Sequence, residues 1–110
     1  MKTICVPLTI EAMRLLDIND CPDHLLESTS LTEEEYEQLL EARALGEINN
    51  TIGKIIDEYE DESITTPTEL KETLQILKTH LNIKNSKTLN KIIHLNALAI
   101  NRNTGLFFFF

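Results

Sequence analysis

The sequence is poor in the residues that break a chain or tie it covalently. Its 110 residues include three glycines, three prolines, two cysteines and no tryptophan. Few breakers favour helices, and two cysteines do not make a disulfide framework. No apolar run approaches 18 residues, and residues 1–10 lack the apolar region of a secretory signal. We therefore expect a single domain over residues 1–110, located in a reducing cytoplasm and not in a membrane.

Acidic residues are absent from the last third of the chain. All eighteen acids lie in residues 1–72, where five basic residues leave a net charge of −13. Residues 73–110 hold five basic residues and no acid, a net charge of +5. The overall charge of −8 disfavours nucleic acid and anionic membranes as partners. The two parts should attract each other, or one of them faces a partner.

Catalytic signatures are also missing. The sequence has no glycine-rich phosphate loop and no nucleophile–histidine set, and its clustered carboxylates lack the apolar pocket that acid–base catalysis needs. Cys21 and His24 have the C-x-x-H spacing of half a zinc site, but Cys5, His80 and His94 show no companion spacing. A small buried thiol beside a capping or surface histidine is the simpler interpretation. We expect no enzyme activity, no cofactor and no metal.

Capping residues predict where the helices begin. Thr32 followed by Glu35 forms a capping box, and Thr66-Pro67-Thr68-Glu69 combines a cap, a first-turn proline and a capping acid. Thr9 should begin an earlier helix, and Asn85 or Ser86 a last one. Two helices are expected at about 33–45 and 47–60, or one bent helix, with the break or kink at Gly46. Another is expected from 67 to about 80, and the last runs from its cap at Asn85 or Ser86 to about residue 100. An apolar stripe marks the second of these: Leu45, Ile48, Ile52, Ile55, Ile56 and Tyr59.

The remaining segments predict turns, links and two strands. Residues 21–26 read as a short helical turn with Pro22 at its first position, and residues 28–30 and 63–65 as polar links. Residues 2–6 are rich in β-formers. Four consecutive phenylalanines at 107–110 place apolar side chains on both faces of any strand, so both faces must be covered. We predict a mostly α (α+β) fold: about five helices and a two-stranded sheet that pairs residues 2–6 with residues 105–110.

The segment Leu31–Glu62 is the most acidic, with eleven acids against Arg43 and Lys54. Three acids at 33–35 suit a helix N-terminus, where the dipole favours negative charge. The expected helix end at residue 60 would place five acids where the dipole disfavours them. Such acids form either a solvated surface or a binding surface. The candidate partner-binding residues are Glu34, Glu37, Glu41, Asp57, Glu58, Glu60, Asp61 and Glu62.

In size, helical content and its acidic helix pair at residues 32–62, the chain resembles the small acidic immunity proteins of bacterial toxin systems, of the contact-dependent growth inhibition and colicin types. The resemblance implies an inhibitor, monomeric when free, that forms a heterodimer with one basic cognate toxin, here expected to be a nuclease. The toxin's basic cleft would bind carboxylates where it otherwise binds phosphates. The N-terminal strand and the final GLFFFF depart from the plain helix bundle of the colicin group.

Two other classes of function stay open. A self-associating adaptor would use the phenylalanine tail or the apolar face of residues 70–81 as its interface. A nucleic-acid mimic that regulates a host protein would share the acidic surface and differ in its target. The basic residues Lys87, Lys91 and Arg102 make a small candidate nucleic-acid site, but it lacks interleaved aromatic residues and faces a strongly acidic remainder.

Overall fold

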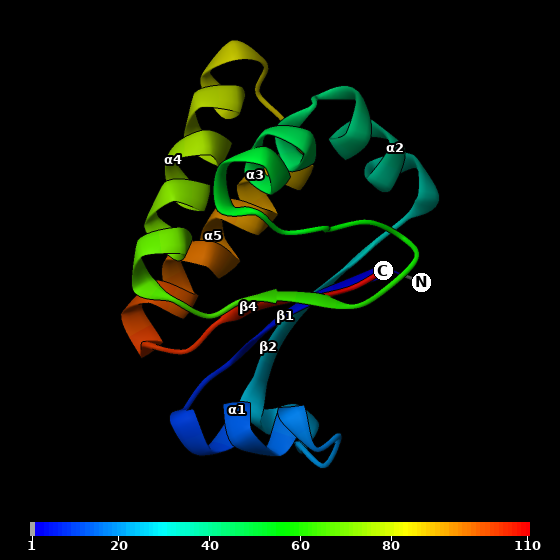
Figure 1. The fold of residues 1–110 in the computed structure, drawn as a ribbon. Helices are drawn as coiled ribbons and strands as arrows, with labels where there is room; N and C mark the ends of the chain where they lie inside the picture. The colour runs from blue at the N-terminus through cyan, green and yellow to red at the C-terminus, as the bar shows by residue number, and fades with distance from the viewer. Residues whose placement is uncertain (1) are drawn as a thin grey trace.

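An antiparallel sheet lies at the centre of the molecule, with helices α2, α3, α4 and α5 on one side and α1 on the other (Figure 1). The structure is a computed structural model that describes residues 2–110. Over that range it contains five α-helices, a short 3-10 helix and four strands. The elements are β1 (Lys2–Pro7), α1 (Ile10–Asp17), η1 (Asp23–Leu25), β2 (Leu26–Leu31), α2 (Glu33–Glu41), α3 (Ala44–Ile52), β3 (Glu62–Ile64), α4 (Pro67–Ile83), α5 (Lys87–Arg102) and β4 (Leu106–Phe109).

The two ends of the chain pair in the middle of the sheet, as the sequence predicts. Strand β1 runs antiparallel to β4, with Ile4 opposite Phe108 and Cys5 opposite Phe107. The prediction of a two-stranded sheet is wrong, because β2 adds to the outer side of β1 and β3 to the outer side of β4, in the order β2-β1-β4-β3. The segments expected to be polar links at 28–30 and 63–65 largely form these edge strands. An edge strand is held by main-chain hydrogen bonds and needs few apolar side chains, so composition hides it.

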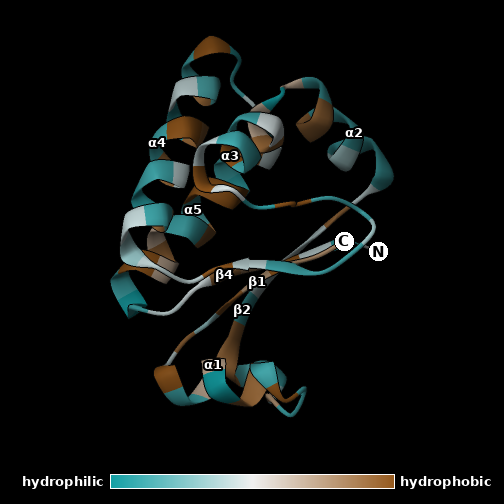
Figure 2. Ribbon diagram, viewed as in Figure 1, coloured by the Kyte–Doolittle hydropathy of each residue, from teal (hydrophilic) through white to brown (hydrophobic). Residues whose placement is uncertain are grey.

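The sheet buries one face much more completely than the other. Side chains at alternate positions of β1 and β4 point to the four-helix side, and Ile4, Val6, Leu106 and Phe108 there are at most 1% exposed. Phe107 and Phe109 point the other way and stay half-buried. Figure 2 shows the hydrophobic colouring of β1 and β4 beside the mostly hydrophilic connection that leads from α3 into β3. The single helix α1 therefore covers its face of the sheet incompletely.

The four helix starts predicted from capping residues are confirmed. Thr9, Thr32, Thr66 and Ser86 all precede a helix, and each side chain accepts a hydrogen bond from the backbone N–H three residues later. The Thr32–Glu35 capping box is complete: the Glu35 N–H donates to Thr32 Oγ1 over 3.1 Å, and the Thr32 N–H donates to Glu35 Oε1 over 3.0 Å. Pro22 differs slightly from expectation, since it lies just before η1 and not inside it.

The predicted helix at 47–60 is too long, and its break from the preceding helix is misplaced. Helix α2 ends at Glu41, Arg43 adopts a left-handed conformation with φ of 62°, and Gly46 lies inside α3. Helix α3 then ends at Ile52, because Gly53 turns the chain with φ of 69°. Residues 53–61, here called the acidic loop, connect α3 to β3 without regular structure. Two members of the predicted apolar stripe, Ile55 and Tyr59, consequently lie outside any helix.

Close packing fixes the entrance to β4. A side chain at Gly105 would come within 2.9 Å of the Thr65 methyl group and 3.0 Å of the Ile64 carbonyl oxygen, so this position admits glycine alone without rearrangement. Just before it, the buried Thr104 hydroxyl donates a 2.7 Å hydrogen bond to the Pro7 carbonyl oxygen. This bond links the turn after α5 to the end of β1. The last strand therefore enters the sheet at one defined position.

Candidate functional site

The eight acids singled out in the sequence lie on α2, in the acidic loop that follows α3, and at the start of β3. Glu34, Glu37 and Glu41 are exposed on α2, and Glu58, Glu60 and Asp61 are exposed in the acidic loop. Asp57, in the same loop, and Glu62, the first residue of β3, are half-buried. Two segments separated in sequence by α3 thus supply carboxylates to the surface.

Most of these carboxylates are not neutralised by the protein itself. Ion pairs involve other acids: Lys2 Nζ lies 3.1 Å from Glu33 Oε1, Lys91 Nζ lies 2.9 Å from Glu35 Oε2, and His80 Nε2 lies 2.8 Å from Glu47 Oε1. Of the five basic residues after residue 72, Lys91 alone forms an ion pair within residues 2–110. Among the candidate acids, Glu62 pairs with Lys54 at 4.0 Å. Across the same residues the other seven form no ion pair: Glu34, Glu37, Glu41, Asp57, Glu58, Glu60 and Asp61.

The two acidic segments meet around Tyr36 and Lys2. The Lys2 ammonium group lies 4.6 Å from the centre of the Tyr36 ring and bonds Glu33 on α2. Burial raises the pKa of the Tyr36 hydroxyl, and the negative charges of Glu58 and Asp57 in the acidic loop raise it further. The hydrogen bond to Glu33 raises the pKa of Lys2, and the charge of Glu58 adds to this effect. Acids from both segments therefore act on the same small region.

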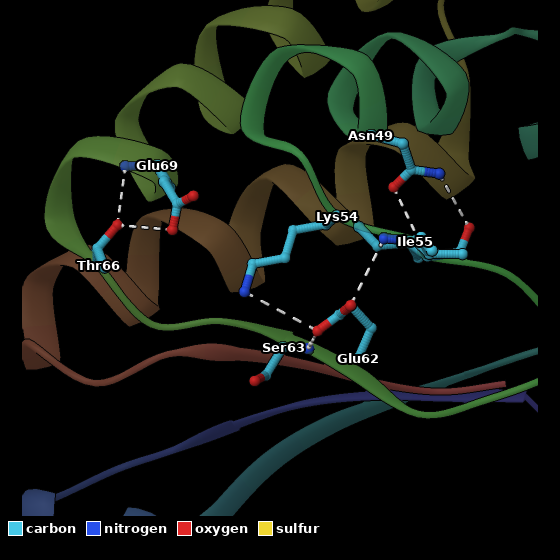
Figure 3. A network of polar contacts seen from close by, with 8 residues as sticks. Asn49, Lys54, Ile55, Glu62, Ser63, Thr66 and Glu69 are labelled. Atoms are coloured by element: carbon cyan, nitrogen blue, oxygen red, sulfur yellow. Dashed lines mark hydrogen bonds and ion pairs between the residues drawn. The ribbon is translucent and has the colours of Figure 1, made fainter.

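The acidic loop is anchored at its start by a side-chain clamp (Figure 3). The Ile56 N–H donates to Asn49 Oδ1 over 2.9 Å, and Asn49 Nδ2 donates to the Ile56 carbonyl oxygen over 3.3 Å. Ile56 itself is 2% exposed, so its side chain anchors the loop to the core. Glu62 accepts from the Ile55 N–H over 3.5 Å and pairs with Lys54, as Figure 3 shows. The residues between these anchors are held in place while their side chains project outward.

Two apolar residues in the acidic loop were not foreseen as part of a site. The sequence pattern assigns Ile55 and Tyr59 to a buried stripe, but they are 58% and 86% exposed. Tyrosine is among the residues that most often dominate the binding energy of protein interfaces. A signal for this exposure does exist in the sequence: Tyr59 stands among four acids at 57, 58, 60 and 61, an unusual setting for a core residue.

The acids at 57–62 do not lie at a helix end, which corrects the expectation drawn from the dipole. They follow the end of α3 by five residues or more, beyond the last-turn reach of the helix dipole. Their position therefore carries no dipole penalty that function would have to explain. Interest in Glu58, Glu60 and Asp61 rests instead on their exposure and on their lack of ion pairs within residues 2–110. All three stand within two residues of Tyr59 in the sequence.

Both cysteine thiols have raised pKa values. Burial raises the pKa of the Cys5 thiol from 9.0 to about 11, so Cys5 stays protonated at neutral pH. Burial also raises the pKa of Cys21, and the charges of Asp23 and Asp20 act in the same direction. Within residues 2–110, no group of three or more histidine, cysteine and acidic side chains is arranged to hold a metal ion.

Comparison with known proteins adds no relative: no family model matches the chain, and no match was found among curated proteins or solved structures. Along residues 2–110, no helix combines the length and the apolar character needed to cross a membrane.

Proposed function

We propose that this protein is a noncatalytic inhibitor that binds a basic protein through the acidic surface formed by α2 and the acidic loop. One observation carries the proposal: seven carboxylates on α2 and in the acidic loop remain without ion pairs within residues 2–110, and the loop also carries a tyrosine that is 86% exposed. Unpaired surface acids give a strong negative field, and an exposed aromatic residue gives a contact that can be desolvated on binding. Together these features suit a charged protein interface.

The specific form that we propose is an immunity protein that neutralises a cognate bacterial toxin, with a nuclease as the expected target. A nuclease needs a basic cleft for phosphates, and carboxylates can occupy that cleft in their place. The size of the chain, its helices and its acidic surface support this form, as does the resemblance described above. In the complex, Glu34, Glu37 and Glu41 would meet basic residues, while Tyr59 and Ile55 would be buried at the centre of the contact.

Charge reversal tests the role of the acidic surface. The variant Glu34→Lys/Glu37→Lys/Glu41→Lys should slow association with the product of the adjoining gene, in catalytically inactive form, by an order of magnitude or more. A matched variant, Asp23→Lys/Glu27→Lys/Glu72→Lys, changes the net charge equally at exposed acids outside α2, the acidic loop and β3. It should change the rate much less. Equal effects of the two variants would reject a localised site, and absence of binding by the unmodified protein would reject the immunity form.

The salt dependence of the association rate separates long-range electrostatic attraction during the encounter from short-range contacts in the complex. If unpaired acids guide the encounter, the rate for the unmodified protein should fall steeply between low and physiological ionic strength, where the screening length shortens to about 8 Å. The triple variant on α2 should show a shallower dependence, because fewer charges contribute. A dependence that is unchanged in this variant would contradict the proposal.

A self-associating adaptor is the second candidate, and the exposed Ile55, Tyr59 and Ile83 favour it, since exposed apolar side chains can also join two copies. Its test is the mass in solution. The inhibitor proposal expects a monomer at micromolar concentration, because a net charge of −8 makes two copies repel each other. A stable dimer whose formation requires Tyr59 would favour the adaptor instead.

A further inference from the structure

A groove lies between α1 and the β3–β4 side of the sheet, with a volume of about 420 Å³. Its aromatic wall is formed by Phe107 and Phe109, whose rings stack with centroids 6.4 Å apart and planes 22° apart. The rest of the lining comes from two places. Leu16, Asp17 and Asn19 lie at and just after the end of α1, and Asp61, Glu62 and Ser63 lie just before and at the start of β3.

The groove follows from the incomplete cover that α1 gives to the sheet. Cys5 on β1 is 2% exposed, whereas its cross-strand neighbour Phe107 on β4 is only half-buried. Helix α1 spans eight residues and packs mainly against β1, so it covers β4 less completely. The two half-buried phenylalanine rings therefore keep part of their apolar surface open on this sheet face.

The rim of the groove is negative. Asp17, the last residue of α1, and Asp61, the residue before β3, are both exposed, and neither forms an ion pair or side-chain hydrogen bond within residues 2–110. No lysine, arginine or histidine lines the groove. The C-terminal end of α1 adds partial negative charge at the same place. Glu62 contributes less, because its carboxylate points toward Lys54 and Ile55 (Figure 3).

We propose that this groove binds the side chain of an arginine from the partner protein. A guanidinium group is planar, stacks on aromatic rings and is weakly hydrated, and its N–H groups fit carboxylates. In the groove, Phe107 and Phe109 supply aromatic rings for the flat face of the guanidinium group. Asp17 and Asp61 supply carboxylates that can accept from its N–H groups. An anionic ligand would be repelled by the rim, and a purely apolar one would leave both carboxylates without a partner. The inference rests on the proposed function, because Asp61 belongs to the acidic loop as well as to the groove.

The groove can be tested with a small probe, without the partner. The peptide acetyl-Gly-Arg-Gly-amide is titrated into the full-length ¹⁵N-labelled protein, and the backbone amides of Ser63, Phe107 and Phe109 are followed by NMR. We expect their shifts to move together and to saturate. The matched peptide with citrulline in place of arginine keeps the shape and loses the charge. It should bind about tenfold more weakly, since a desolvated cation–aromatic contact contributes roughly 1–2 kcal/mol.

Two variants separate the groove from the general acidic surface. Asp17→Asn/Asp61→Asn should weaken arginine-peptide binding several-fold, whereas Glu34→Gln/Glu37→Gln removes the same charge from α2 and should leave it unchanged. Phe109→Leu keeps an apolar side chain but removes the aromatic face, and it should also weaken binding. Shifts that map to other residues, equal binding of the citrulline peptide, or equal effects of the two amide variants would overturn the proposal.

The outcome is distinguishable from failure of the proposed function. The peptide titration needs no partner protein, and the triple variant on α2 needs no groove. If partner binding depends on Glu34, Glu37 and Glu41 but the groove does not bind arginine, the inhibitor proposal stands and this inference is overturned. A groove that binds arginine in a protein whose acidic surface binds no basic partner would give the opposite result.

Discussion

The helix-covered side of the sheet and the acidic loop place large apolar side chains in opposite environments. On the first, Ile4, Leu106 and Phe108 are at most 1% exposed, whereas in the second Ile55 and Tyr59 are 58% and 86% exposed. Folding accounts for the first arrangement, because apolar burial is its main driving force. It does not account for the second, because exposed apolar residues add no folding energy. The difference is what the proposed interface in the acidic loop would require.

The largest effect should follow from damage to the covered side. Phe108→Ala removes a 1% exposed aromatic side chain and leaves a cavity, so we expect the free energy of unfolding to fall by about 3–5 kcal/mol. Phe109→Ala, on the partly open face of the same strand, should cost less. Urea denaturation of both variants measures the difference. Equal losses would mean that the two faces of β4 contribute alike, and the comparison would fail.

Removing an unsatisfied polar group from the core should stabilise the protein. Asn96 on α5 is 0% exposed, and neither its amide nitrogen nor its oxygen has a hydrogen-bond partner within residues 2–110. Leucine is close in size, so Asn96→Leu should raise the free energy of unfolding by about 1–3 kcal/mol. Thr73→Val, at a second buried side chain that finds no partner among the same residues, should act in the same direction. A drop in the urea midpoint for both variants would contradict this account of the core.

Loss of the helix cap should have a smaller effect. Thr32→Ala removes the side chain that accepts from the Glu35 N–H at the start of α2, which should cost about 1 kcal/mol. Thr68→Ala is the matched control, because Thr68 forms no side-chain hydrogen bond within residues 2–110. Thermal unfolding followed by circular dichroism compares the two. A larger loss for Thr68→Ala would show that the cap is not what holds the start of α2.

The same cap should make stability depend on pH at its acidic limit. The hydrogen bond from the Thr32 backbone, together with Lys91, holds the pKa of Glu35 below its ordinary value of 4.5. A lowered pKa favours the folded state above pH 4.5, and this contribution is lost as the pH falls through the lower folded-state value. Glu35→Gln should therefore flatten the fall of stability below pH 4.5. Glu34→Gln, one residue away and outside the capping box, should leave the acid profile as it is.

The smallest effect on stability should come from the acidic loop. Ile55→Ser/Tyr59→Ser replaces the two exposed apolar residues, and the free energy of unfolding should stay within about 0.5 kcal/mol of the unmodified protein. Partner affinity should nevertheless fall by tenfold or more if these residues are interface anchors. Denaturation and binding measured on one preparation give both values. A large loss of stability here would assign Ile55 and Tyr59 to the fold.

Local features of the sequence determined the starts of the helices. The caps at Thr9, Thr32, Thr66 and Ser86 accept from backbone amides three residues later. Residues close in sequence are therefore enough to predict these helix starts. The pairing of the two chain ends was also predictable, because four consecutive phenylalanines must be covered on both faces of a strand. Of the site, the sequence specified the abundance of acids in residues 31–62.

Tertiary structure decided the rest. Strands β2 and β3 exist because β1 and β4 offer them hydrogen bonds, and helix α3 ends at Ile52 because Gly53 and the Asn49–Ile56 clamp redirect the chain. Which acids are neutralised depends on contacts far along the chain, such as that between Glu35 and Lys91, which are 56 residues apart. These outcomes depend on distances between segments, and distances arise only once the sheet and helices have packed. The exposure of Tyr59 among unpaired carboxylates is one of those outcomes.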